Sequence, residues 1–318
     1  MKYRAIINEA WALTQTNKKL IWAFAFVPAL LTTLVSIVYM TYQVAAFYTS
    51  PFLNPGIPED KHALNFVFHT LMVAFKTNPS FTVFFLILVL LVVLAYIMIP
   101  VFTQGALIQT LARIRAGQEV PLVEGITYGF TRFLQLLEYN LAIKSFSLFS
   151  LLGEAAFVFR NLGPNVFGFL GWIFLLATLV GMAVTLLFTY AEYYIVIDKQ
   201  GVVASMIKSS GLVIRQWHHT LFMLFLMAMI ILRVLVNLLV AMLLPLLVIG
   251  PLFIFTSMTL AVVGAVVGGV VGLVGLYFAS YFLGIFHVFV TGVWTFTFLE
   301  LTSAEKNDID LHEAAVHE

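Results

Sequence analysis

Ionisable and polar side chains set deep inside long apolar segments are the residues of this chain best suited to chemistry. Glu154, Arg233 and His287 lie in different segments at a similar predicted depth, and Asn237 follows Arg233 by one helical turn on the same face. A charge inside the hydrocarbon of a bilayer is costly, so such residues usually face the protein interior and have a partner there. The sequence therefore predicts a buried polar cluster of Glu154, Arg233, Asn237 and His287.

Three interpretations of this cluster remain open. It could be an internal tie that fixes the register of helices in a medium with few other polar partners. It could be a functional polar site, such as a substrate anchor or a proton relay, in which His287 titrates near neutral pH. It could also open to an outer aqueous vestibule, because Glu154 and Arg160 both lie toward the outer half of their segment.

A second pair of charges is predicted nearer to the cytoplasmic boundary. Lys144 lies about seven residues into its segment and Glu192 about six residues before the end of another, so at about 1.5 Å per residue both are about 10 Å from that boundary. Their equal depth makes Lys144 and Glu192 a candidate ion pair.

Metal, redox and catalytic chemistry are not expected. The chain has no Cys, which excludes disulfides, thiolate metal sites and cysteine nucleophiles. His287 has no second His at metal-ligand spacing, and no Ser/His/Asp set or pair of carboxylates at metal-ligand spacing converges. No basic block exceeds two adjacent residues, so nucleic-acid binding is not expected either. We therefore predict a protein that is not an enzyme and uses no metal and no cofactor.

The elements that carry these residues are predicted membrane spans. The 318-residue chain is 62% hydrophobic and 10% charged, with a mean hydropathy of +1.04, so lipid must cover most of its surface. A helical span needs about 20 mostly apolar residues. Six windows qualify: 20–46, 82–112, 137–159, 167–197, 218–244 and 270–300. The predicted fold class is an all-α membrane protein with six transmembrane helices, or seven if residues 251–269 span the membrane instead of forming a re-entrant segment.

Internal repetition favours six spans. A unit of amphipathic cytoplasmic helix, outward span and long return span occurs three times, at about 1–116, 117–198 and 199–301. The return spans end in similar motifs, which are Phe102-Thr-Gln-Gly-Ala106, Phe188-Thr-Tyr-Ala-Glu192 and Phe289-Val-Thr-Gly-Val293. These tandem units form a single polytopic membrane domain over 1–301. The acidic residues 302–318 are predicted to be a disordered cytoplasmic tail.

Positive charge predicts the orientation of the chain. Eleven of the 16 Lys and Arg residues fall on the side that holds the N-terminus, the 113–136 and 198–217 connections and the tail. The opposite side holds only Lys61, Lys76 and Arg160. Because positive residues in short loops stay cytoplasmic, both termini are predicted to be cytoplasmic.

The predicted cytoplasmic helices are amphipathic. Between residues 122 and 137, apolar residues recur at helical spacing, namely Ile126, Phe130, Phe133, Leu134 and Leu137. Such a helix should lie in the headgroup plane, as a structural elbow or as a surface that senses lipid or docks a partner. Similar spacing over residues 64–75 predicts a short amphipathic helix on the outer side.

A glycine repeat predicts a place of close helix packing. Gly264, Gly268 and Gly272 recur every four residues, which is typical of a face that lets another helix approach closely. The same face could instead form the seam of a homodimer.

The stretch Tyr193–Arg215 joins a return span to the next cytoplasmic helix. Its pattern consists of an acidic residue followed by small and apolar positions: Asp198, Gly201, Val202, Ala204, and Ser209 or Ser210. This pattern resembles the membrane domain of glycerophosphodiester phosphodiesterases and related prokaryotic multi-span proteins of unknown function, and residues 102–117 followed by 124–133 fit it as well. The resemblance implies a six-span protein of the bacterial or archaeal cytoplasmic (inner) membrane. It does not imply phosphodiesterase activity, which belongs to a separate soluble domain with carboxylate and His metal ligands.

Two classes of function follow. The first is a non-enzymatic integral membrane protein that acts as a structural, lipid-organising or partner-regulating module, with membrane lipids and a second copy or another membrane protein as partners. The alternative is a transporter or permeation protein with a polar site at Glu154, Arg233 and His287. Repeats and the helix prolines Pro28 and Pro100 favour transport, whereas an odd number of repeats opposes it, since alternating access usually relies on paired repeats.

Overall fold

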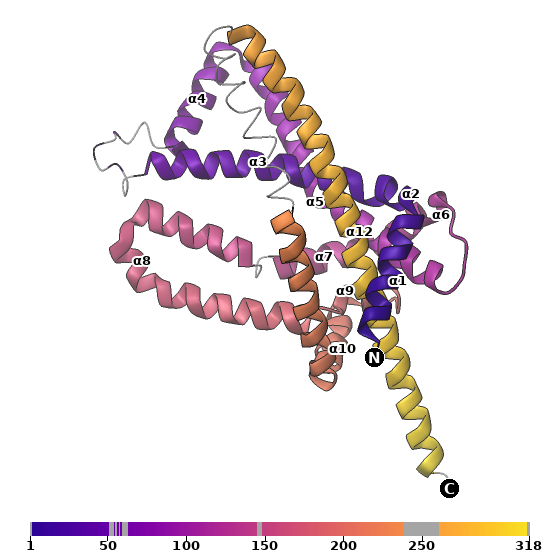
Figure 1. Cartoon of the computed structure of the whole chain (residues 1–318). Coiled ribbons are helices and arrows are strands. Elements are labelled where there is room, and N and C mark those ends of the chain that lie inside the picture. The colour runs from indigo at the N-terminus through magenta and orange to yellow at the C-terminus, as the bar shows by residue number, and fades with distance from the viewer. Residues whose placement is uncertain are drawn as a thin grey trace. The chain divides into compact units, whose positions relative to one another are not determined.

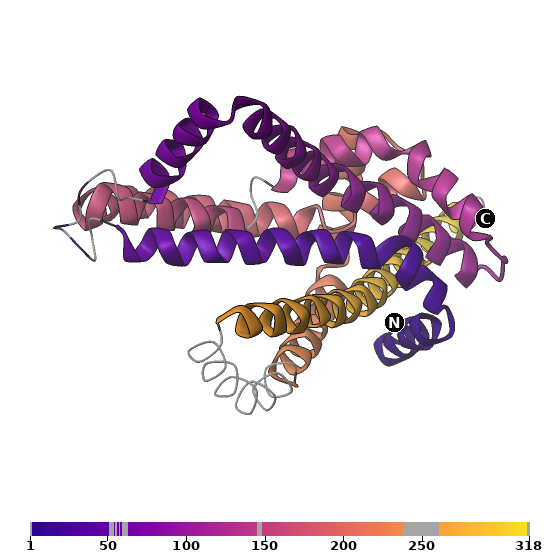
Figure 2. The same ribbon diagram turned by 90° about the horizontal axis from the view of Figure 1, so that it is seen from above.

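All regular elements that the structure describes are helices. The computed structural model describes residues 2–50, 54, 56, 58, 63–144, 148–237 and 261–316 (Figures 1 and 2). Within these ranges, five helices are long and apolar enough to cross a membrane: Lys18–Tyr48, Pro79–Arg115, Asn165–Leu187, Trp217–Asn237 and Val262–Ser303. The chain is therefore a helical, multi-pass membrane protein, as its composition predicts.

The predicted window 137–159 is not one of these five helices. Its residues are divided between α7 (Phe133–Lys144) and the start of α8 (Leu148–Leu187). The ribbon of α8 doubles back on itself in Figure 1, and the candidate span in its second limb begins at Asn165, directly after Gly163 and Pro164 in the sequence. Six spans and three tandem repeats stay predictions.

The chain forms two compact units, each described here by itself. One unit comprises Leu31–Val213, and the other combines Met1–Leu30 with Ile214–Glu318. The borders near residues 30 and 213 differ from the predicted repeat borders, because the N-terminal residues pack with the C-terminal part of the chain.

Helix α5 (Pro79–Arg115) organises the unit Leu31–Val213. It follows α4 (Ala63–Thr77), which packs against it and occupies the predicted outer helix. The apolar residues of the first half of α5 are exposed, as expected of a helix that faces lipid, whereas Val101 and Leu107 are buried. Helices α6 (Leu122–Thr131), α7 and α9 (Ala191–Val196) pack around this second half. The core of the unit therefore lies at the C-terminal end of α5.

Two glycines allow the helices around the second half of α5 to approach closely, Gly129 between α5 and α6 and Gly105 between α5 and α7. A Cβ atom on Gly129 would lie 2.9 Å from the carbonyl oxygen of Phe102 and 2.7 Å from its ring, and one on Gly105 would lie 2.7 Å from Leu136. Gly125 and Gly129 form the buried side of α6, one turn apart. Ile126 and Phe130 of α6 are exposed, and so is Leu134 of α7. The apolar surface predicted over residues 122–137 is thus divided between α6 and α7, because α6 ends at Thr131.

A serine of α10 (Val202–Arg215) closes the break between α8 and α9. The Ser209 hydroxyl donates to the carbonyl of Leu187 at 2.8 Å and accepts the N–H of Tyr190 at 3.0 Å. Both backbone groups lie where the chain leaves one helix and enters the next, so their hydrogen bonds must come from elsewhere. Buried Ser209 supplies both.

In the other unit, α1 (Tyr3–Thr16) lies against α12 (Ala261–Val316) (Figure 1). A Cβ atom on Gly292 of α12 would lie 3.4 Å from the Cβ of Ala10. After the short α2 (Lys18–Leu20), the π-helix η1 (Ile21–Ala25) packs against Gly284, whose Cβ would lie 3.3 Å from Ile21. A π-helical turn widens the backbone locally, and here it is opposed by a residue without a side chain. The chain then continues as α3 (Phe26–Tyr48).

Helix α12 covers part of the predicted re-entrant segment 251–269 and most of the predicted tail 302–318. Residues 261–269 form its first turns, while 251–260 lie outside the described residues. Its backbone stays helical to Val316, across residues predicted to be a disordered tail, and the Ala, Glu and Leu in that segment are strong helix formers.

The predicted glycine face of α12 is only partly enclosed. Gly264 is buried, Gly268 is half-buried, and Gly272 is exposed, with open space where its Cβ would lie. The close contacts that the structure shows on α12 are instead at Gly284 and Gly292.

Candidate functional site

The residues of the predicted polar cluster are divided between the two units. Glu154 belongs to the unit Leu31–Val213, whereas Arg233, Asn237 and His287 belong to the other. The side chains of Glu154, Arg233 and Asn237 are exposed, and His287 is half-buried. A cluster of all four residues stays a prediction.

Glu192, one half of the predicted ion pair, lies near the side chains of Gln104, Tyr139 and Tyr193. Its carboxylate accepts the side-chain N–H of Gln104 at 3.2 Å. Lys144 ends α7, and its side chain lies outside the described residues, so this pair also stays a prediction.

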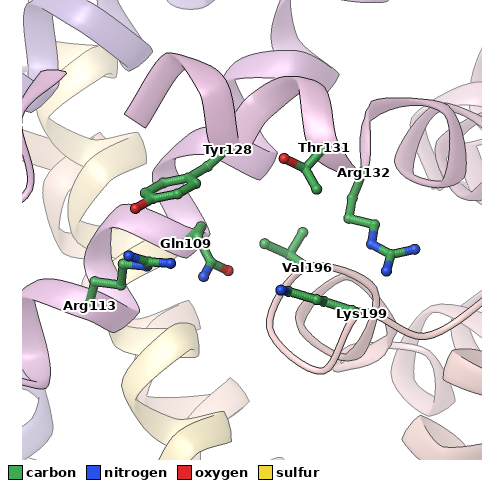
Figure 3. Close-up of a pocket in the computed structure, with 7 residues that line it drawn as sticks. All are labelled: Gln109, Arg113, Tyr128, Thr131, Arg132, Val196 and Lys199. Carbon is green, nitrogen blue, oxygen red and sulfur yellow. The ribbon is translucent and has the colours of Figure 1, made fainter. Parts of the chain in front are cut away.

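The structure brings a different set of charges together at the C-terminal end of α5. A cavity of about 130 Å³ is lined by residues of α5, α6 and the chain around α9: Gln109, Arg113, Tyr128, Thr131, Arg132, Val196 and Lys199. Arg113 and Tyr128 lie on one side of the space, and Arg132 and Lys199 lie on the other (Figure 3). Three cations thus line one small cavity, and we call it the cation cavity.

Arg113 is the cation of this set whose charge is already balanced. Its guanidinium lies 3.4 Å from the carboxylate of Glu124 and 4.3 Å from the centre of the Tyr128 ring. The Tyr128 hydroxyl donates to the same carboxylate. Desolvation and this hydrogen bond raise the pKa of Tyr128, so its phenol stays neutral and keeps its hydrogen bond to Glu124 at neutral pH.

Arg132 and Lys199 are the cations that lack a counterion. Neither forms an ion pair within the part of the chain that the structure describes. The Nε atom of Arg132 is buried without a hydrogen-bond partner, and so is the Oε1 atom of Gln109. Buried polar atoms in proteins are almost always paired, and the exceptions frequently mark a missing ligand or water. The cation cavity therefore has two uncompensated positive charges and two unsatisfied polar atoms.

The backbone at Lys199 is strained. Its φ of 56° lies in the left-handed region, and Lys199 is the only non-glycine residue of the described chain with a positive φ. This conformation costs a residue with a Cβ about 1–2 kcal/mol relative to the ordinary helical one. The N–H of Gln200 donates to the carbonyl of Tyr194 at 3.2 Å and closes the turn. Lys199 thus occupies a position where glycine would be less strained, and its positive charge lies beside the cavity.

This arrangement suits a small oxyanion. Arg and Lys are the side chains that bind phosphate, with Arg offering a planar fork of N–H donors and Lys a point charge. The cavity volume of about 130 Å³ accepts a phosphate group but not a whole lipid. The exposed apolar side of α6 adjoins the cavity, because Tyr128 and Thr131 of that helix line it.

Sequence reasoning treats these residues only as positive charges that set orientation. Arg113, Arg132 and Lys199 all belong to the predicted cytoplasmic side. Nothing in their spacing shows that α6 folds back on α5 and that the turn after α9 meets both. Gly129 carries the relevant signal, because it allows the close approach of α6 to α5, and residues of both helices line the cavity.

The chain was compared with protein families, curated proteins and solved structures. No protein-family model, curated protein or solved structure matches this chain.

Proposed function

We propose that this protein is a non-enzymatic, lipid-organising membrane protein that binds the phosphate of an anionic phospholipid in the cation cavity. The observation that supports this most directly is the pair Arg132 and Lys199, whose charges have no counterion within the described residues although both side chains line the same small cavity. Basic pockets between transmembrane helices on the cytoplasmic side are typical binding sites for anionic headgroups.

The position of the cavity supports a lipid rather than a free anion. Arg113 lies in the last turn of the candidate span Pro79–Arg115, so the cavity lies at the predicted cytoplasmic end of that helix. Ile126 and Phe130 of α6 are exposed beside it, and an amphipathic helix with such a face lies along the acyl chains just below the headgroups. A headgroup in the cavity would leave its chains against this face.

The proposed architecture is six spans in three tandem units with both termini in the cytoplasm of a prokaryote. Three equivalent contacts support it. Each predicted cytoplasmic helix touches one return-span motif: α6 at Phe102, α10 at Tyr190, and α1 at Phe289 and Gly292. The reversal of the chain within α8 supplies the connection that a third and a fourth span require (Figure 1). The excess of positive charge at the predicted cytoplasmic side supports the orientation.

Lipid retention by the purified protein tests this function. The chain is extracted in neutral detergent, and native mass spectrometry measures its binding of phosphatidylglycerol and phosphatidylcholine. We expect Arg132→Gln with Lys199→Gln to bind phosphatidylglycerol at least about tenfold more weakly, since hydrogen bonds to charged groups contribute about 1.5–3 kcal/mol each. Lys18→Gln with Lys208→Gln, which removes two exposed charges outside the cavity, is the matched control.

Two further results decide the proposal. Inorganic phosphate at millimolar concentration should not displace the lipid, and if it does, the cavity is a site for a free anion. Equal binding of phosphatidylglycerol by the cavity variant and the wild-type protein, or equal loss in the control, contradicts the proposed function.

A further inference from the structure

A third charged residue without a counterion, Arg160, lies elsewhere in the unit Leu31–Val213. The Arg160 side chain of α8 is 4% exposed, and its guanidinium donates to Gln43 Oε1 of α3 at 2.5 Å. The rings of Tyr42 and Phe157 lie about 6 Å from it. No carboxylate within the described residues forms an ion pair with it. A buried guanidinium without a counterion costs several kcal/mol, so this position favours an anion from outside the chain.

Arg160 lies at one end of a large cavity between α3 and α8. The cavity has a volume of about 1140 Å³, and Tyr96 of α5 also lines it. On α3 it follows one helical face through Thr32, Val35, Ser36, Tyr39 and Gln43. This face extends about 16 Å at 1.5 Å per residue. We call this space the interhelical cavity.

The wall on α8 also follows one helical face. Ser150, Gly153, Glu154, Phe157 and Val158 line the cavity from α8. The two helices run alongside each other in Figures 1 and 2, and they meet where Gly153 leaves room for the Tyr39 hydroxyl, since a Cβ there would lie 2.8 Å from it. The space therefore combines one buried cation with a long, mostly apolar interior.

The depth of the charge fits the head of an amphiphile. Gln43 lies five residues before Tyr48, the end of the candidate span, which is about 7.5 Å along the helix axis. The rest of the lining on α3 extends from there toward the middle of the span. An anion beside Arg160 would thus lie near the headgroup level, with an attached chain pointing into the hydrocarbon region.

Glu154 restricts how such a molecule lies. Its carboxylate lines the same cavity, six residues before Arg160 along α8, which is about 9 Å of helix. No ion pair joins the two side chains in the described structure. An acidic head is attracted by Arg160 and repelled by Glu154, so only its chain can occupy the part of the cavity beside Glu154.

We infer that the interhelical cavity binds an amphiphile with an anionic head on an acyl chain, with the head on Arg160 and the chain between α3 and α8. Two sources share this chemistry, a free fatty acid and an anionic phospholipid that inserts one chain. This site is separate from the cation cavity, with which it shares no lining residue.

Photo-crosslinking tests the inference. The full chain in phosphatidylcholine nanodiscs is irradiated with a diazirine analogue of palmitic acid, and the labelled peptides are mapped by mass spectrometry. We expect label on α3 and α8 between residues 32–43 and 150–158. Arg160→Gln should lower the apparent affinity at least tenfold. Lys76→Gln, which removes an exposed charge of α4, should leave it unchanged.

Competition on the wild-type protein keeps the test decisive even if Arg160→Gln does not fold. Unlabelled oleate or phosphatidylglycerol should displace the probe, and the stronger competitor identifies the source of the ligand. Methyl oleate, which has the same chain without the charge, should displace it at least tenfold less well. Val158→Trp, which places a larger side chain in the cavity beside Phe157, should lower the label on both helices.

Several outcomes would overturn the inference. These are equal competition by methyl oleate, competition by neither acid, and unchanged labelling in Arg160→Gln or Val158→Trp. The Arg132→Gln, Lys199→Gln variant of the cation cavity should label as the wild type does, so failure of one site is distinguishable from failure of the other.

Discussion

At the scale of single residues, this protein uses small polar side chains to complete backbone hydrogen bonds at helix ends. Ser209 is the clearest case, because its hydroxyl both donates to and accepts from the break between α8 and α9. Ser210, the next residue, donates to Met206 of its own helix at 2.9 Å. Of these two adjacent serines, only Ser209 links α10 to the break between α8 and α9, whereas Ser210 bonds within its own helix.

Replacing Ser209 by Ala should destabilise the fold. The change leaves the Tyr190 N–H and the Leu187 carbonyl without their side-chain partner, which costs about 1–3 kcal/mol for a buried group. Ser210→Ala is the control and should change the free energy of unfolding by less than about 0.5 kcal/mol. Unfolding in mixed micelles of increasing denaturing-detergent content, followed by circular dichroism, measures both. A larger effect for Ser210→Ala would contradict the assignment of roles.

The sequence predicts that one of these two serines belongs to the pattern at the start of α10, but it does not distinguish them. The distinction depends on where the break between α8 and α9 lies relative to α10, which is a tertiary property. The surroundings of Arg160 are likewise not predictable from the sequence. By position it belongs to an outer connection, whereas in the fold it is buried against Gln43, 117 residues earlier in the chain.

At the scale of helices, close packing depends on glycines that no regular repeat indicates. Gly129 of α6 meets the ring and the carbonyl of Phe102 on α5. The regularly spaced Gly272 of α12, in contrast, faces open space. The spacing of glycines in the sequence identifies a helix face without side chains. Whether that face packs closely depends on whether a partner helix lies against it.

Gly129→Ala and Gly211→Ala should have opposite effects. In Gly129→Ala, the new Cβ would lie 2.9 Å from a backbone carbonyl, so the helices must separate, at a cost of about 1–3 kcal/mol. Gly211 of α10 has no atom within 4 Å of its Cβ position, so alanine there should stabilise the helix by up to about 1 kcal/mol. The midpoint of thermal unfolding should fall for Gly129→Ala and rise or hold for Gly211→Ala. A fall of equal size in both would argue against close packing at Gly129.

The periodic elements of this fold are predictable because they depend on local patterns. The helical, membrane-embedded class follows from composition, and α4 and α6 lie where apolar spacing predicts helices. The cation cavity does not follow in this way. Arg113, Arg132 and Lys199 come from three different segments, and their convergence requires both the close approach of α5 and α6 and the left-handed turn at Lys199.

At the scale of the whole molecule, the number of spans determines where the two termini lie. An even number places both on one side of the membrane, and an odd number separates them. The structure describes five candidate spans, and the sequence predicts a further span over 137–159.

Thiol labelling of single-cysteine variants tests this topology in a chain that has no native Cys. Cysteines at Lys2 and Glu318 should resist an impermeant maleimide in intact cells and react after permeabilisation, whereas a cysteine at Lys61 should react in intact cells. Protection of both termini supports six spans with cytoplasmic ends. Labelling at position 318 but not at position 2 would show an odd number of spans and contradict the three-unit architecture.

The pairing of α1 with α12 has a consequence for how the chain is made. Ala10 leaves the ribosome about 280 residues before its partner Gly292. At a synthesis rate of about 5–20 residues per second, that delay is about 14–56 s. During this time α1 lacks its contacts with α12, and the membrane surface is where an amphipathic helix can remain without aggregating. The first helix to be synthesised therefore completes its fold only when the last span has been inserted, so a truncated chain would leave α1 exposed to the proteases that remove unfinished proteins.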